Sequence, residues 1–413
     1  MEALSASLHK VKGLGIGNDY RQWNLLREDV SLPTAILLSE NIEHNLHWMQ
    51  TFIDKYRVKL APHGKTTMSP KLFHKQLEHG AWAITLATVN QVQVAQAAGI
   101  HRVLMANQLV GKTNILIIRR LLDENPDFDF YCLVDSEENV QQLSQYFPSE
   151  KGRRLQVLLE IGVDQGRTGV RSEHDEQALV DSIEQQKHAI ELAGVELYEG
   201  VLNNEQGVRA MLKRTVASLH RLATSNRLSR QPPILSGAGS SWYDIVAEEF
   251  AQISFPVDIL LRPGCYVSHD LGVYHQSQIR ILQQNTIAQE ISAEGGLKPA
   301  LQIWAYVQSI PETKRAIIAF GKRDAAFDAG FPLPILHYRF GWLEPKSIDE
   351  QQYTITKMMD QHAFLDCPIE HELHVGDMIG FNISHPCLTF DKWRNLLLVD
   401  RDYNVIDIIE TQF

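Results

Sequence analysis

Between residues 34 and 270, short apolar runs rich in branched side chains alternate with longer polar stretches of helical periodicity. The apolar runs are TAILL, RVKLA, WAITLA, RVLMAN, FDFYCLV, LQVLLEI, GVELYEG, PPILS and VDILLRP. The polar stretches cover residues 40–54, 69–79, 89–98, 136–146, 172–192 and 206–224. Strands that alternate with helices indicate βαβ units and a parallel sheet. Nine strand candidates suit an eight-stranded (β/α)8 barrel with one strand left over better than an open sheet, and such a barrel places its chemistry at the carboxyl ends of the strands.

The pattern changes after residue 275. The runs there are short, resemble β-strands and are separated by turns: QNTIAQEISA, ALQIWAYVQSI, RAIIAF, MIGFNIS and LLLVDRDYNVIDII. They predict a separate, mainly β domain after the barrel. The predicted fold class is therefore α/β, a TIM-like (β/α)8 barrel followed by a mainly β C-terminal domain.

Composition excludes several classes of protein. A hydrophobic fraction of 44% with 22% charged residues is ordinary for a globular chain of 413 residues. The net charge of -11, without any Lys/Arg block, argues against nucleic acid and anionic membranes as partners. No apolar run approaches the roughly 20 residues of a membrane helix. The N-terminus has no secretory signal, and the four cysteines form no Cys-x-x-Cys pair, so we expect a soluble cytoplasmic protein.

The stretch LAPHGKTT at 60–67 places Lys65 after a glycine and two residues after His63. A phosphate-binding loop needs a glycine five residues before its Gly-Lys pair, but Lys59 holds that position and Pro62 has no N–H to donate. In extended chain, His63 and Lys65 face the same side, just past the carboxyl end of a strand. There a lysine can form an imine with an aldehyde cofactor. An exposed lysine in a polar loop is the alternative for this segment taken alone.

Two further segments are suited to a phosphate group. LSGAGSSWYD at 235–244 is a strand followed by a Gly/Ser loop and a helix start, where free N–H groups and the hydroxyls of Ser240 and Ser241 can bind an anion. The next strand ends in RPGCYVSHD, where Gly264 allows a ligand to approach the backbone. A plain turn is the alternative for each segment alone.

The segment FNISHPCLTFDKW at 381–393 contains a possible metal pair. His385 and Cys387 alternate with Pro386, so both side chains point to one side in extended chain. Imidazole and thiolate suit zinc, and two protein ligands leave coordination positions open for water or substrate. A packed histidine beside a buried cysteine is the alternative.

Taken together, these segments resemble the D-threonine aldolase / D-serine dehydratase family of alanine racemase-like, fold type III pyridoxal phosphate (PLP) enzymes, in particular the D-serine deaminase-like members. The resemblance rests on APHGKTTMSP, EIGVDQGRTGVR, VELYEG, LSGAGSSWYD, RPGCYVSHD and GDMIGFNISHPCLTFDKWR, which follow one another in the order of the family. The segment after Tyr198, EGVLNNEQG, matches no single subgroup.

The resemblance implies a PLP-binding barrel at 37–270 and a β-rich domain formed by 1–36 and 271–413, usually as a homodimer. It assigns the Schiff base to Lys65, and it assigns the metal, expected to be Zn²⁺, to His385 and Cys387. The residues that it implies for binding the cofactor are Lys65, His63, Arg167, Tyr198, Gly237, Gly239, Ser240, Gly264, Cys265 and Tyr266.

The implied reaction is a β-elimination from a 3-hydroxy D-amino acid such as D-serine or D-threonine, giving a 2-oxo acid and ammonia. Lys65 would remove the Cα proton, and the metal would help the β-hydroxyl to leave. The same groups permit retro-aldol cleavage to glycine and an aldehyde, but Cys387 as a soft ligand favours elimination within the family. A non-catalytic PLP-binding protein is a further alternative, which the β domain argues against. A racemase would need a second acid/base, for which Tyr306 carries no motif.

Overall fold

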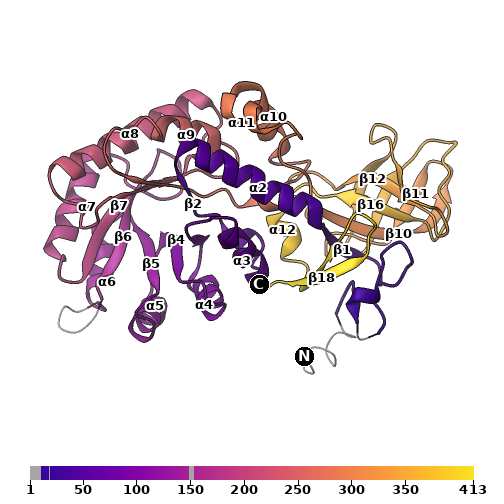
Figure 1. Ribbon diagram of the computed structural model, residues 1–413, viewed down its shortest axis with the longest axis horizontal. Helices are drawn as coiled ribbons and strands as arrows, with labels where there is room; N and C mark the ends of the chain where they lie inside the picture. Colours follow the sequence, from indigo (N-terminus) through magenta and orange to yellow (C-terminus); the bar gives the residue numbers. More distant parts are fainter. Residues whose placement is uncertain (1–10, 18, 148–152) are drawn as a thin grey trace. The chain divides into compact units, whose positions relative to one another are not determined.

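The computed structural model describes residues 11–17, 19–147 and 153–413 (Figure 1). The chain divides into two compact units. The barrel unit consists of Gln50–Lys65 and Phe73–Gly264. The β unit consists of the described residues up to Met49 together with Thr66–Leu72 and Cys265–Phe413.

The barrel unit is built on eight parallel strands in the order β2-β9-β8-β7-β6-β5-β4-β3. The strands are β2 (Lys59–Leu60), β3 (Ile84–Leu86), β4 (Arg102–Gln108), β5 (Asp129–Val134), β6 (Leu155–Ile161), β7 (Ile190–Leu197), β8 (Ile234–Gly237) and β9 (Asp258–Leu261). The two ends of this order are joined where the chain continues past β2. Trp82 N–H donates to Leu60 O at 2.7 Å, and Thr85 N–H donates to Pro62 O at 2.8 Å. These bonds close the sheet on itself, and the predicted fold class is confirmed.

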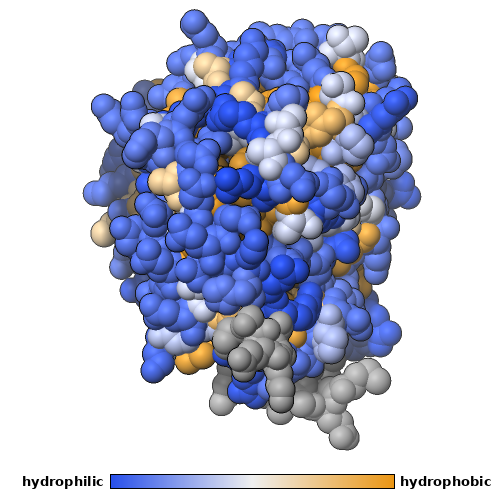
Figure 2. All heavy atoms as spheres, turned by 90° about the vertical axis from the view of Figure 1, so that its left-hand side faces the viewer, coloured by the Kyte–Doolittle hydropathy of each residue, from blue (hydrophilic) through white to orange (hydrophobic). Residues whose placement is uncertain are grey.

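Helices follow the strands and lie on the outer side of the sheet (Figure 1). They are α4 (Val89–Ala97), α5 (Lys112–Glu124), α6 (Glu137–Ser144), α7 (Glu173–Gln185), α8 (Glu205–Thr224) and α9 (Tyr243–Phe250). Two earlier helices, α2 (Ser39–Tyr56) and α3 (Pro70–Glu78), have residues in both units. Several begin at a residue whose side-chain oxygen accepts a hydrogen bond from the first turn, namely Thr88, Ser136, Ser172 and Asn204. The outer face of this unit, which carries α6, α7 and α8, is predominantly hydrophilic (Figure 2).

Side chains that alternate along the strands fill the inside of the barrel. The buried cluster consists of Ala61, Ala83, Leu104, Ala106, Tyr131, Leu133, Leu158, Ala193, Ile234 and Leu260. Four alanines stand beside larger side chains in this set, so small and large residues interdigitate in a closed cylinder. The barrel interior is therefore a packed core, and only the ends of the strands offer room for a ligand.

The β unit contains a sheet in which the central order is β13-β12-β16-β10-β1-β17-β18, with β11, β15 and β14 attached through β10. The strands are β1 (Thr34–Leu38), β10 (Leu301–Glu312), β11 (Arg315–Ile318), β12 (Leu333–Tyr338), β13 (Lys346–Ser347), β14 (Thr354–Met358), β15 (Ala363–Asp366), β16 (Met378–Asn382), β17 (Asn395–Val399) and β18 (Val405–Glu410). Strand β1 lies between β10, to which it is antiparallel, and β17, to which it is parallel.

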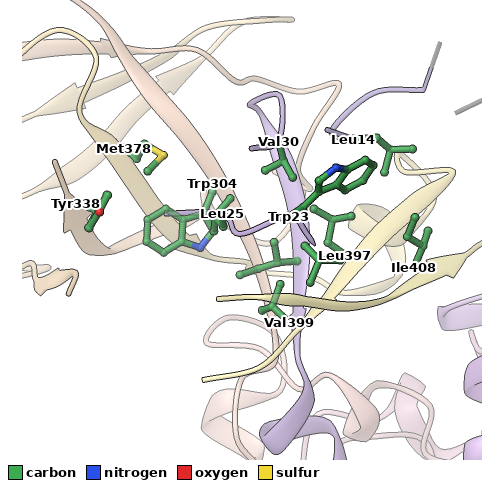
Figure 3. Packing of buried hydrophobic residues seen from close by; sticks show 12 residues of the cluster. Leu14, Trp23, Leu25, Val30, Trp304, Tyr338, Met378, Leu397, Val399 and Ile408 are labelled. Carbon is green, nitrogen blue, oxygen red and sulfur yellow. The ribbon is translucent and has the colours of Figure 1, made fainter. Parts of the chain in front are cut away.

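The segment before β1 covers part of this sheet (Figure 3). Leu14, Trp23, Leu25 and Val30 belong to one buried cluster with Ile36, Trp304, Tyr338, Met378, Leu397, Val399, Val405 and Ile408. Trp23 is 4% exposed, and its Nε1 donates to Ile16 O at 3.0 Å, so its polar atom has a partner inside this packing. Burial of these large side chains fixes the N-terminal segment on the sheet.

The prediction of a strand in QNTIAQEISA was wrong. The chain forms α10 (His275–Gln284) and α11 (Thr286–Ile291) there instead. Asn285 accepts a hydrogen bond from Ala288 N–H at 2.8 Å and thereby caps α11, which decides the segment against the β preference of Thr286 and Ile287. Within residues 11–17, 19–147 and 153–413, no helix combines the length and apolar character needed to cross a bilayer.

Candidate functional site

The predicted cofactor-binding residues of the barrel unit all lie at or after the carboxyl ends of parallel strands. His63 and Lys65 follow β2, Arg167 follows β6, Tyr198 follows β7, Gly237, Gly239 and Ser240 end or follow β8, and Gly264 follows β9. Carboxyl ends of parallel barrel strands meet at the same rim, so the topology brings these residues to one end of the barrel. The structure thus gathers side chains that are far apart in sequence.

Lys65 lies in the 3-10 turn η2 (Gly64–Thr66), and its side chain is exposed. The extended run assumed from the sequence ends at His63, whose main chain bridges to Thr85 of β3. An alanine Cβ at Gly64 would lie 2.7 Å from side-chain carbons of Ile84 and Phe73. Glycine at position 64 therefore lets the turn approach the barrel wall closely.

His63 carries a buried, unsatisfied nitrogen. Among the described residues Nδ1 has no hydrogen-bond partner. Burial, and then the positive charges of Arg262, Lys65 and Arg167, hold the pKa of His63 well below its usual range. The imidazole is therefore neutral at pH 7 and offers an unused polar atom beside Lys65, as expected where a polar ligand completes the hydrogen bonding.

Tyr198 links two of the predicted loops. The guanidinium carbon of Arg167 lies 4.2 Å from the centre of the Tyr198 ring, within the range of a cation–π contact. A Cβ at Gly239 would lie 3.2 Å from Cε2 of Tyr198, and one at Gly200 would lie 2.5 Å from its hydroxyl oxygen. Both glycines are thus needed for the tyrosine ring to pack in this position.

Two backbone N–H groups of the loop after β8 donate hydrogen bonds to a carboxylate of the protein itself. Glu199 is fully buried, and its two oxygens accept hydrogen bonds from Ala238 N–H at 3.1 Å and from Gly239 N–H at 2.7 Å. Burial raises the pKa of Glu199, while the backbone hydrogen bond from Gly239 opposes that change. The N–H of Gly239, assigned to a phosphate by the sequence, is thus engaged by Glu199, which orders the loop.

Ser240 and Gly264 connect the two loops that the sequence assigned to a phosphate. The hydroxyl oxygen of Ser240 lies 3.3 Å from the N–H of Gly264, so the loop after β8 is joined to the turn after β9. Below them, Arg262 is 1% exposed and donates to Leu197 O at 2.8 Å and to the carboxylate of Glu196. Sequence analysis did not single out this buried pair.

The remaining predicted residues belong to the β unit. Cys265 and Tyr266 lie on the 3-10 turn η4 (Cys265–Val267), and their side chains are buried. His385 precedes and Cys387 begins the short helix α12 (Cys387–Phe390). The helix bends the chain after Pro386, so the pair is held by a helix start and not by the extended chain assumed from the sequence.

His385 is oriented by a carboxylate that sequence analysis missed. Its Nδ1 lies 2.8 Å from Oδ2 of Asp328. Hydrogen bonds to Cys387 and Asp328 raise the pKa of His385 to about 9, against the opposing effect of burial. When Nδ1–H donates to the carboxylate, Nε2 remains for a metal ion, an arrangement common in metal-binding histidines.

Cys387 lies in a small cluster of polar groups. Its sulfur is 3.6 Å from the sulfur of Cys265 and 3.4 Å from the hydroxyl oxygen of Thr66. Hydrogen bonds from Cys265 and then from His385 lower the pKa of Cys387, whereas the bond to Cys387 raises the pKa of Cys265. Cys387 is therefore the thiolate of the pair, the form that binds metal ions.

The donor set fits a divalent metal with open coordination positions. In the part of the chain that the structure describes, no three or more His, Cys, Asp or Glu side chains are arranged to hold a metal ion. His385 and Cys387 thus form a two-residue set of nitrogen and soft sulfur, which suits zinc. Nearby, Asp270 is fully buried, and burial raises its pKa to about 6.

Comparison with known proteins identifies the family. Residues 38–267, more than half of the chain, match the model of the alanine racemase N-terminal domain family. The chain belongs to this family. A second model, that of a serine dehydratase domain, matches residues 300–399, which include His385 and Cys387. The match to the alanine racemase N-terminal domain family covers most of the barrel unit, in agreement with its strand order.

Two curated relatives are similar to this chain in sequence. D-threonine aldolase of Arthrobacter sp. is 26% identical over 391 residues, which cover 92% of this chain and 92% of the relative. D-threo-3-hydroxyaspartate dehydratase of Delftia sp. (strain HT23) is 27% identical over 244 residues, covering 58% of this chain and 61% of the relative.

Solved structures share the fold. D-threonine aldolase from Filomicrobium marinum superposes with a TM-score of 0.75 at 22% identity, covering 93% of this chain and 95% of that chain. D-threo-3-hydroxyaspartate dehydratase from Delftia sp. HT23 superposes with a TM-score of 0.74 at 21% identity, covering 95% of this chain and 99% of that chain. These structures are members of the alanine racemase-like fold class, and this chain adopts the same fold.

Proposed function

We propose that the protein is a PLP- and metal-dependent dehydratase of 3-hydroxy D-amino acids such as D-serine or D-threonine, which releases a 2-oxo acid and ammonia. Both curated relatives are named for reactions of 3-hydroxy D-amino acids. The observation that carries the choice of reaction is the pair of His385, oriented by Asp328, and the thiolate of Cys387. The predicted homodimer and cytoplasmic location stay predictions.

The rim of the barrel fits a phosphorylated aldehyde cofactor. Lys65 is exposed in its turn, and the buried Nδ1 of His63 has no partner among the described residues. Glu199 orders the loop after β8 by accepting hydrogen bonds from Ala238 N–H and Gly239 N–H. Lys65 would hold PLP, and when bound the cofactor supplies an electron sink for the electrons left at Cα. Residues of the β8 and β9 loops, Ser240 and Gly264 among them, would bind the phosphate.

The chain's own groups have separate roles in this proposal. The Nζ of Lys65 accepts the Cα proton as the general base. His63 stays neutral, because burial and neighbouring cations lower its pKa, so it adds no further positive charge beside Lys65. Arg167, which packs on the ring of Tyr198, would disfavour protonation of the pyridine nitrogen of bound PLP if it faces that atom.

The β unit would hold the metal through Nε2 of His385 and Sγ of Cys387. The metal supplies a Lewis acid that makes the β-hydroxyl a better leaving group. Asp328 fixes the ring of His385, and the hydrogen bonds to Cys387 keep its sulfur deprotonated.

D-threonine aldolase activity is the second candidate. The aldolase relative aligns over 92% of this chain, whereas the dehydratase relative aligns over 58%. The same lysine and metal pair would then serve a cleavage between Cα and Cβ, which gives glycine and an aldehyde. The soft sulfur of Cys387 favours zinc and, with it, the dehydratase over this alternative.

The deciding experiment measures absorbance and products of the purified protein with D-serine, D-threonine and their L-forms, with and without a chelator. We expect a band at the violet edge of the visible spectrum, and pyruvate from D-serine that is lost on chelation. Glycine and acetaldehyde from D-threonine, without pyruvate from D-serine, would establish the aldolase instead.

Two variants make this test specific. Lys65→Ala should lose both the band and turnover, whereas Lys112→Ala, which removes an exposed lysine at the start of α5, should keep both. A protein without the band, or a Lys65→Ala variant that keeps it, contradicts the assignment of Lys65. Loss of turnover on chelation with an unchanged band assigns the metal to the reaction and not to cofactor binding.

A further inference from the structure

Two of the four cysteines lie with their sulfur atoms in contact. Sγ of Cys265 and Sγ of Cys387 are 3.6 Å apart, although the residues are 122 positions apart in sequence. The described residues include all four cysteines, and none of them forms a disulfide. A disulfide requires an S–S distance of about 2.05 Å, so the two sulfurs would have to approach by roughly 1.5 Å. Cys265 and Cys387 are therefore positioned to be joined.

The two thiols differ in accessibility. Cys265 is buried, at 3% exposure, whereas Cys387 is partly exposed at the start of α12. A dissolved oxidant thus reaches Cys387 first, and Cys265 stands behind it. This is the usual arrangement of a reactive cysteine and a resolving cysteine. Cys132 and Cys367 are buried in other parts of the chain and serve as internal references.

We infer that Cys265 and Cys387 form a reversible disulfide on exposure to a hydroperoxide, an oxidative modification site at the predicted metal pair. Hydrogen peroxide transfers one oxygen to the Cys387 sulfur and leaves as water, giving a sulfenic acid. The thiol of Cys265 then attacks that sulfur, the S–O bond breaks, and a second water leaves as the S–S bond forms. Two thiols lose two electrons, and one peroxide is reduced to two waters.

The modification has a consequence that rests on the proposed function. A disulfide sulfur is no longer a thiolate, so Cys387 cannot serve as a metal ligand while it is bonded to Cys265. In the part of the chain described, no set of three or more donors is arranged to hold a metal ion, so loss of Cys387 would leave His385 as the remaining member of the pair. Oxidation would then release the metal, and a dithiol would restore its binding.

The test treats the full-length protein, with and without added zinc, with hydrogen peroxide. The free thiols are then alkylated in denaturant, so that the buried cysteines also react, and the protein is analysed by mass spectrometry. We expect the number of alkylated cysteines to fall from four to two, and a peptide that links Cys265 to Cys387 and disappears with dithiothreitol. Zinc should slow the reaction, and a metallochromic dye should report zinc release as the disulfide forms. Cys367→Ser should form the same link at the same rate.

The variant Cys265→Ser decides whether Cys265 is the resolving residue. It should form no link and instead accumulate sulfinic acid on Cys387. The variant Cys265→Ala and thermal melting check that the fold is retained. If Cys387 is oxidised in wild type without any link to Cys265, the inference is overturned. Equal loss of zinc affinity in Cys265→Ser and Cys387→Ser also overturns it, because Cys265 is then a ligand. A reversible link in a protein that binds no zinc in either state supports the thiol pair and contradicts the proposed metal.

Discussion

Asp328 accepts a hydrogen bond from His385, with 2.8 Å between Oδ2 and Nδ1, across 57 positions of sequence. Replacement of the carboxylate by an amide removes the charge that orients and polarises the imidazole. We expect Asp328→Asn to bind zinc about 10–100-fold more weakly than wild type, as is typical when the hydrogen-bond partner of a metal-bound histidine is changed. Competition with a chromogenic chelator measures this affinity.

Asp360→Asn is the matched control for Asp328→Asn. The Asp360 side chain is 74% exposed, and its nearest cationic partner, Arg323, lies 3.8 Å away. The zinc affinity of the Asp360→Asn variant should equal that of wild type. Unchanged zinc affinity in Asp328→Asn would show that the hydrogen bond to His385 has no part in metal binding.

Glu199→Gln tests the carboxylate that orders the loop after β8. Both oxygens of Glu199 accept backbone N–H groups, and an amide can replace only one of these acceptors while it turns a donor toward the other N–H. An unsatisfied buried N–H costs about 1–3 kcal/mol. We therefore expect a weaker affinity for PLP, measured by equilibrium dialysis, and a lower melting temperature. Glu173→Gln, at a side chain 75% exposed, should change neither.

His269→Asn tests a buried histidine in the β unit. Burial, and then the charge of His275, lowers the pKa of His269 to about 4 from 6.5. Above pH 6.5 neither the folded nor the unfolded state is protonated there. Between pH 6.5 and 4 the unfolded state binds more protons, so stability is lost as the pH falls, by up to roughly 3 kcal/mol in total. Asparagine tolerates the φ of 44° at this position.

The measurement is the free energy of unfolding in urea at pH values between 4 and 8. We expect a shallower acid slope in His269→Asn than in wild type, whatever its absolute stability. His174→Asn, which changes a histidine with 92% of its side chain exposed, should keep the wild-type slope. Equal slopes in His269→Asn and wild type would rule out His269 as a source of acid sensitivity.

Gly64→Ala tests the close approach of the Lys65 turn to the barrel wall. The added methyl would lie 2.7 Å from carbons of Ile84 and Phe73, so the core must shift. Overpacking of this kind costs about 1–3 kcal/mol. Urea unfolding should show this loss, and the absorbance band of bound cofactor should weaken. Gly207→Ala, where the new methyl would meet only side-chain atoms of Asn204 and Leu202 at 3.3 Å or more, should be neutral or stabilising.

The parallel strands could be predicted because most are apolar runs followed by a polar helix, and such runs have few other structures open to them. Side chains of Thr88, Ser136, Ser172 and Asn204 cap four of these helices. Lys65 followed from the predicted end of the strand before it, whereas Tyr198 was predicted from the family resemblance. The strand expected near Thr286 was wrong, because the capping side chain of Asn285 outweighs a short β-like pattern.

Contacts made by long-range tertiary packing could not be predicted. Asp328 lies in GKRDAAFDAG, a segment whose sequence is typical of a charged turn. Nothing in this local sequence indicates a contact with His385. The role of Glu199 could not be predicted for the same reason, since its hydrogen-bond partners lie on the loop after another strand. A partial signal did exist for Glu196, a carboxylate within the apolar run GVELYEG, which indicates a buried cation such as Arg262.

Strand β1 has a consequence for the order in which the protein can fold during translation. Ile36 of β1 pairs with Leu397 of β17. Strand β1 is synthesised early, so it can pair with β17 only after nearly the whole chain has been translated. The barrel unit is complete once residue 264 has left the exit tunnel and can fold first. Until first β10 and then β17 have been synthesised, β1 exposes apolar residues that lack their neighbouring strands. Nascent chains are most prone to aggregation or chaperone binding in such an interval.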